Sequence, residues 1–142
     1  MPYCTLQDLT DRYSQRMLVD ISDRGDEATG DVDTALIGRA IADADALIDG
    51  YLKVRYALPL AAVPRLVTDL SLRIAIYYAH GHVAAEKIAA DYKEAIRTLQ
   101  EISRGVVQLD VDGLEPAESG GVEVRTNAEE RVFTANTMRG YI

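Results

Sequence analysis

The sequence predicts a mainly α-helical protein: a small bundle of about four to five helices around a long central helix, then a short extended or β segment and a C-terminal arm. Apolar residues recur at three- and four-residue spacing through the first 104 residues, the period of helices with one buried face. Glycine, proline or helix-capping residues separate these runs. The chain has 142 residues, of which 48% are hydrophobic, enough for one modest core. We therefore expect a helical domain at residues 1–109, with a linker and arm at 110–142.

Two short helices are expected at the start of the chain. Thr5 precedes the run "LQDLTDRY", and Asp8 stands three residues later. This spacing resembles a capping box with Asp in place of Glu or Gln, and it predicts a helix over about 6–13. Ser14 then restarts a second short helix, "QRMLVDIS".

The longest helix is expected to run from Asp33 to about Tyr56. Asp33 is a suitable N-cap residue, because its carboxylate can accept from the free amides of the first turn. At about 1.5 Å per residue this helix is roughly 35 Å long, the width of a small domain. Its apolar stripe comprises Leu36, Ile37, Ala40, Ile41, Ala44, Leu47, Ile48, Tyr51 and Leu52.

An apolar corner, "ALPLAAVP", follows the long helix. Pro59 stops the helix because it lacks an amide donor and disfavours helical geometry before it. Pro64 suits the first turn of the next helix. We expect this stretch to be core and corner, and an interface role for Arg55 or Leu60 is the open alternative. The predicted core and corner residues are Tyr51, Leu52, Tyr56, Pro59 and Pro64.

Two more amphipathic helices are expected, from Pro64 to about His80 and over about 84–103. Gly81 is a candidate stop for the first, and Gly105 is a natural C-terminal stop for the second. The apolar stripes are Leu66, Val67, Leu70, Ile74 and Tyr77 in the first helix, and Ile88, Tyr92, Ile96, Leu99 and Ile102 in the second.

The character of the sequence changes after Gly105. The segment "VVQLDVDG" alternates well enough for one short strand or an extended arm. Residues 114–131 are rich in Glu, Gly, Ser and Asn and are interpreted as a linker or mobile loop. Apolar side chains return in "RVFTANTMRGYI", which is too short to form a core. This stretch either folds back on its own domain or docks on another molecule.

An acid-rich loop at residues 23–33 invites comparison with a calcium loop. An EF-hand loop needs oxygen ligands at positions 1, 3 and 5 and glycine at position 6. Counting from Asp23, position 3 is Gly25 and position 6 is Ala28, so the pattern fails. We expect a solvated loop with helix-capping aspartates, and a cation site of another type is the alternative. The acids are Asp23, Asp26, Asp31 and Asp33.

Three aspartates on the long helix and one arginine on the next are the other charged candidates. Asp45 and Asp49 lie one helical turn apart, with Asp43 close by, and paired carboxylates can perform acid/base chemistry. No basic or nucleophilic residue accompanies them in the sequence, so a solvated or subunit-facing surface is expected. Arg73 either covers the core with its stem or forms an ion pair with one of these aspartates.

No cofactor, metal or enzymatic activity is expected. His80 and His82 form an H-x-H pair, but a metal site needs three or four ligands, and the only cysteine is Cys4. The net charge of −8 argues against a nucleic-acid-wrapping surface. No apolar run could span a bilayer, and the N-terminal residues lack the apolar core of a signal peptide. We expect a soluble, intracellular protein.

Several segments, in this order, resemble the phage-Mu-type head–tail connector family. The resemblance spans nearly the whole chain, and it is most specific in the middle segment and in the terminal F-x-x-x-x-M-R-G-Y pattern. These segments are "TLQDLTDRY", "DADALIDGYLKVRYALPLAAVP", "LRIAIYYAHG", "YKEAIRTLQEISRGVVQL" and "RVFTANTMRGY".

The resemblance implies a structural component of the virion neck, the head–tail junction of a tailed phage, a prophage or a gene transfer agent. Such connectors are helical and form a homo-oligomeric ring, of about twelve copies, under the portal protein. They join the DNA-filled head to the next neck or tail protein, and the free subunit can stay monomeric until the portal templates it.

Two groups of residues take roles from this resemblance. The acids Asp43, Asp45 and Asp49 are candidate channel-facing residues, past which DNA moves without specific binding because like charges repel. The C-terminal arm is expected to contact another subunit or the portal, with packing on its own domain or disorder as the alternative. Its contact residues are Phe133, Met138, Arg139, Gly140 and Tyr141.

Three rival interpretations remain at this point. A regulatory helical binding module would need clustered base-reading residues with basic flanks, which the charge disfavours. An enzyme would need a convergent catalytic set, whereas the sequence offers scattered carboxylates and two histidines. A neck stopper or tail-terminator protein would be richer in β-structure.

Overall fold

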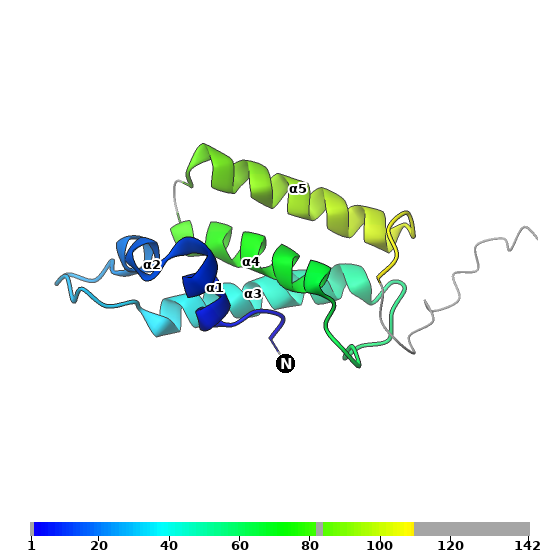
Figure 1. Cartoon of the computed structure of the whole chain (residues 1–142), viewed down its shortest axis with the longest axis horizontal. Coiled ribbons are helices and arrows are strands. Elements are labelled where there is room, and N and C mark those ends of the chain that lie inside the picture. The colour runs from blue at the N-terminus through cyan, green and yellow to red at the C-terminus, as the bar shows by residue number, and fades with distance from the viewer. Residues whose placement is uncertain (1, 82–83, 110–142) are drawn as a thin grey trace, which may run out of the picture.

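The computed structural model describes residues 2–81 and 84–109, and within these ranges all regular elements are helices (Figure 1). The mainly α fold expected from the sequence is therefore confirmed. The predicted linker and arm at 110–142 lie outside the described residues, as does His82. The helices are α1 (Leu6–Tyr13), α2 (Gln15–Ser22), α3 (Thr34–Leu52), α4 (Arg65–His80) and α5 (Glu86–Ser103).

Local capping sets the starts of the first three helices. The Thr5 side chain accepts from the Asp8 amide, and the Asp8 carboxylate accepts from the Thr5 amide, so the predicted capping box is present. The Ser14 hydroxyl accepts from the Met17 amide at the start of α2. Asp33 caps α3, its carboxylate accepting from the amides of Ala35 and Leu36 over 3.1 Å each.

α4 is the helix that contacts each of the other four, and in Figure 1 it lies between α3 and α5. α3 is the long helix expected from the sequence, and it packs most extensively against α4. The buried residues of α4 extend well beyond the predicted stripe, because a helix covered on several sides is apolar around much of its circumference. They are Val67, Leu70, Ser71, Leu72, Ile74, Ala75, Ile76 and Ala79.

The long helix ends earlier than predicted, at Leu52 rather than near Tyr56. The amides of Arg55 and Tyr56 both donate to the Leu52 carbonyl, so the chain tightens into a turn. This turn directs the Tyr56 ring into the core, where 3% of the residue is exposed. The boundary was misplaced because the apolar pattern continues through the turn.

Gly105 ends α5 as predicted. It has a φ of 80°, and its amide donates to the Ile102 carbonyl while the Val106 amide donates to the Glu101 carbonyl. These two bonds form a Schellman motif, which needs a left-handed residue at this place. Residues 106–109 are therefore a turn and a short irregular stretch, so the described part of the predicted extended or β segment is not a strand.

Candidate functional site

The corner between α3 and α4 places a continuous apolar run at the surface. Residues 57–64 contain no polar side chain, and each of them is exposed or half-exposed. Leu58, Pro59, Leu60 and Val63 line one side of a groove of about 490 Å³. Tyr3 and Asp49 form the rest of its lining. We call this feature the corner groove.

Three large apolar side chains within residues 53–66 are exposed. Val54 is 64% exposed, Val63 37% and Leu66 36%. Single exposed apolar residues are common, but a contiguous patch of them usually marks an interaction surface. Leu66 was predicted to face the core and instead lies at this surface.

The predicted core and corner residues divide between the core and the surface. Leu52 and Tyr56 are buried, and Tyr51 packs against the core from a half-exposed position. Pro59 is exposed and lines the corner groove, and Pro64 is the N-cap residue of α4. The prolines thus shape the corner, as predicted, while the run between them stays uncovered.

The described chain ends against this corner. The Leu109 amide donates to the Tyr56 hydroxyl over 2.9 Å, and both residues are buried. Leu109, the last described residue, is therefore held by Tyr56, two positions before Leu58 of the corner groove. Arg55, the other open interface candidate, lies half-buried beside Gly105.

The three aspartates of α3 do not share one environment. Asp43 is exposed, whereas Asp45 and Asp49 are half-buried beneath the N-terminal segment. The Tyr3 amide donates to Asp45 over 3.1 Å, and the Tyr3 hydroxyl donates to Asp49. A solvated or subunit-facing surface was expected for all three acids, whereas Asp45 and Asp49 bind Tyr3, a partner that was missed because it lies more than 40 positions away in the sequence.

A small polar cluster joins the same N-terminal segment to α4. The buried Ser71 hydroxyl lies 3.1 Å from Cys4 Sγ and 3.4 Å from Asp45 Oδ1. Burial raises the pKa of Cys4 to about 11 and also raises the pKa of Asp45. Burial and the raised pKa both disfavour the thiolate of Cys4, which is the nucleophilic form. The cluster anchors the N-terminus to the body.

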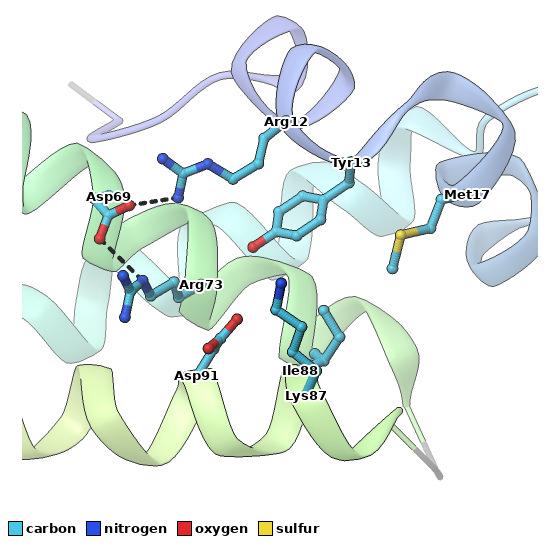
Figure 2. Close-up of a pocket in the computed structure, with 8 residues that line it drawn as sticks. All are labelled: Arg12, Tyr13, Met17, Asp69, Arg73, Lys87, Ile88 and Asp91. Carbon is cyan, nitrogen blue, oxygen red and sulfur yellow. Dashed lines mark hydrogen bonds and ion pairs between the residues drawn. The ribbon is translucent and has the colours of Figure 1, made fainter.

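A second hollow, of about 540 Å³, separates α1 and α2 from α5 (Figure 2). Asp69 on α4 pairs with Arg12 of α1 at 2.5 Å and with Arg73 at 3.0 Å. Arg73 also lies 3.6 Å from Glu94 of α5. Arg73 is partly exposed, as one alternative expected, and the other alternative, an ion pair with an aspartate of the long helix, was wrong because its partners are Asp69 and Glu94. The lining is Arg12, Tyr13, Met17, Asp69, Arg73, Lys87, Ile88 and Asp91.

Ion pairs at this second hollow connect α1 and α5 to α4. Each ion pair is partly exposed, and such pairs contribute at most about 1 kcal/mol to stability each.

A pair of stacked tyrosines also connects α4 to α5: the ring centroids of Tyr77 and Tyr92 lie 4.0 Å apart. The sequence analysis placed both tyrosines on helical stripes but did not identify this contact.

Asp23, the first aspartate of the acid-rich loop, hydrogen-bonds to backbone amides within that loop. Asp23 accepts from the amides of Thr29 and Gly30 over 3.0 Å each, which lowers its pKa. Arg24 donates to the carbonyls of Ile21 and Ala79. The expected helix-capping role is confirmed for Asp33, whereas the Asp23 carboxylate binds amides within the loop.

Metal-ligating side chains do not converge within residues 2–81 and 84–109, where no three of His, Cys, Asp or Glu are grouped. His80 Nδ1 instead lies 2.7 Å from the Ile76 carbonyl oxygen. None of the described helices is both long and apolar enough to cross a membrane. The described residues define a small all-helical fold whose most distinctive surface feature is the apolar corner groove.

Comparison with known proteins gives the family. The Bacteriophage Mu, Gp36 family matches residues 3–126. The chain is 34% identical over 143 residues to Gene product J of Escherichia phage Mu, covering 100% of both proteins. It is 30% identical over 141 residues to the Mu-like prophage FluMu protein gp36 of Haemophilus influenzae, covering 99% of this chain and 98% of that one.

The chain belongs to the Bacteriophage Mu Gp36 family. The phage and the prophage relative both align along essentially their full length, so this is a protein of the Mu-like phage and prophage type. The family match itself ends at residue 126, before the terminal F-x-x-x-x-M-R-G-Y pattern, whereas both pairwise alignments run past it.

Proposed function

We propose that this protein is a head–tail connector, a structural adaptor that joins the DNA-filled head of a Mu-like particle to its tail. The observation that carries the proposal is the full-length relationship to a phage Mu gene product, combined with the five-helix fold that the connector resemblance implies. The helical content of the described residues favours an adaptor over a neck stopper or tail-terminator protein, which would be richer in strands.

In this proposal the subunit forms a ring of about twelve copies under the portal protein and presents a surface to the next neck or tail protein. A ring subunit needs two different patches that meet around the symmetry axis. The corner groove is an exposed apolar patch of the kind such contacts bury. The C-terminal arm, with Phe133, Met138 and Tyr141, supplies apolar side chains for a neighbouring subunit or the portal.

The first experiment is electron microscopy of particles from a producer that lacks the gene. Unjoined filled heads and free tails are expected, and a plasmid copy of the gene should restore joined particles. Intact tailed particles from the deletion strain would contradict the connector role and would reopen the regulatory and enzymatic alternatives.

Deleting residues 132–142 tests the arm. We expect the truncated subunit to keep its helical circular dichroism signal, because the described core lies within residues 2–109, but to fail in complementation of the deletion strain. Normal particle assembly by the truncated subunit would show that the arm makes no required contact.

The structure also refines the test of channel-facing acids. Reversing Asp45 or Asp49 would break their hydrogen bonds to Tyr3, so only the exposed Asp43 isolates the effect of surface charge. Asp43→Lys should slow DNA ejection from assembled particles, because a positive ring would attract the phosphate backbone. Asp26→Lys, in the acid-rich loop, is the matched control. Equal ejection from both variants would remove Asp43 from the channel.

A further inference from the structure

The corner groove is apolar, open and at the point where the described chain ends. Its lining combines four apolar residues of the corner with Tyr3 and Asp49, whose side chains hydrogen-bond to each other. An eight-residue surface run without a polar side chain is costly to leave in water. Something is therefore expected to cover it in the free protein.

The rest of the same chain has suitable chemistry to do so. Residues 131–142 contain Phe133, Met138, Tyr141 and Ile142, together with two arginines and no acidic residue. The chain as a whole carries a net charge of −8, and Asp49 adds a carboxylate to the groove. The segment thus brings apolar side chains to an apolar groove and positive charge to an acidic protein.

The connection is long enough for this contact. Leu109 is held against Tyr56, beside the corner. A flexible chain as long as residues 110–130 would have a root-mean-square span of about 25 Å and a maximum reach of about 70 Å. Such a tether gives an effective concentration in the millimolar range for its own groove. At low protein concentration this exceeds the concentration of any second copy.

We propose that residues 131–142 dock in the corner groove of their own chain while the subunit is free. The bound segment covers Leu58, Leu60 and Val63. This keeps the apolar corner from pairing with other copies until assembly provides a better partner. The docking concerns the free subunit alone, so it holds or fails independently of the connector role.

Cysteine cross-linking in the full-length protein tests the contact. The variant Leu60→Cys/Met138→Cys pairs the groove with the segment, and Val63→Cys/Met138→Cys is a second pair that guards against a local folding defect. The control pair, Glu27→Cys/Met138→Cys, uses the exposed loop at the opposite end of the molecule (Figure 1). The native Cys4 is 1% exposed and stays protonated at neutral pH.

The measurement is the rate of disulfide formation under mild oxidation at low micromolar protein, read on non-reducing gels with peptide mapping. The two groove pairs should form an intrachain disulfide at least about tenfold faster than the control pair, because the docked state raises the local thiol concentration. Equal rates, or no disulfide in either groove pair, would overturn the proposal. A dominant interchain disulfide would show that a second copy occupies the groove, which also overturns it.

Two glutamate substitutions, one inside the corner groove and one outside it, test whether the groove is the surface that residues 131–142 contact. Adding Leu60→Glu to the Val63→Cys/Met138→Cys variant should slow the intrachain reaction several-fold. Adding Val54→Glu, which is exposed but does not line the groove, should leave the rate unchanged. Equal slowing by both substitutions would show that the groove is not the contact surface.

Discussion

Two long connections between the described helices lie at opposite ends of the molecule (Figure 1). They differ in whether their side chains are polar or apolar. Residues 23–33 join α2 to α3, and residues 53–64 join α3 to α4. The first is rich in acids and glycine; Asp23 accepts from two amides within it, and Arg24 donates to carbonyls of α2 and α4. The second ends in eight apolar residues that stay at the surface.

This difference indicates which end of the molecule needs a partner. A loop whose polar groups bind one another gains nothing from being covered, because water already solvates its remaining charges. An apolar surface gains about 25 cal/mol for each Å² that a partner buries. The corner end is therefore the expected site of assembly, and the acid-rich end is expected to remain in solvent.

The largest expected effect comes from the core beneath the corner. Leu52 is fully buried at the end of α3, so Leu52→Ala should lower the free energy of unfolding by about 2–5 kcal/mol. Val54→Ala, two residues later at 64% exposure, should change it by less than about 0.5 kcal/mol. Urea unfolding followed by circular dichroism measures both. Similar losses would mean that Val54 is covered in the free protein.

A smaller effect is expected where the described chain leaves the body. Tyr56→Phe removes the hydroxyl that accepts from the buried Leu109 amide and should cost about 1–3 kcal/mol. Hydrogen exchange should show loss of protection at Leu109. The Val106 amide, which donates to Glu101 instead, is the internal control. Unchanged protection at Leu109 would show that this bond does not hold the end of the body.

The smallest expected effect is on the pH dependence of stability, which should differ between Asp23 in the acid-rich loop and Asp45 on α3. Amide donors lower the pKa of Asp23, so its contribution to stability is present above its ordinary value of about 3.9 and is lost as pH falls through the lowered pKa. Burial raises the pKa of Asp45, so its charge costs stability as pH rises from that ordinary value through the raised pKa.

Asparagine substitutions at these two positions should therefore act in opposite ways. Asp23→Asn should reduce the loss of stability on acidification, whereas Asp45→Asn should gain stability relative to wild type between about pH 4 and pH 7. Urea unfolding across this pH range measures both. Parallel pH profiles for the two variants would contradict the assigned environments.

Local features were predictable from sequence because they involve neighbouring residues. The Thr5 capping box, the Asp33 cap and the stop at Gly105 each depend on groups within five residues of one another. Their hydrogen bonds close short rings, so residue type and spacing are sufficient to predict them. The same holds for the break at Pro59, which follows from the absence of a proline amide donor.

The partners of several charged side chains could not be predicted, because they depend on which helices pack against one another. Tyr3 supplies partners to Asp45 and Asp49 across more than 40 positions, and Arg73 reaches Glu94 on the next helix. Periodicity locates an apolar face but does not say what that face contacts, so α4 appeared to have one stripe although it is covered on several sides.

The sequence by itself determined the helices, their caps and the apolar character of the corner, because each of these follows from backbone chemistry and side-chain type over a few residues. Only the tertiary structure decided that α4 is central, that two of the three α3 acids anchor the N-terminus, and that the corner remains open beside the end of the described chain. The physical reason is that burial and long-range partners are set by the packing of all five helices together.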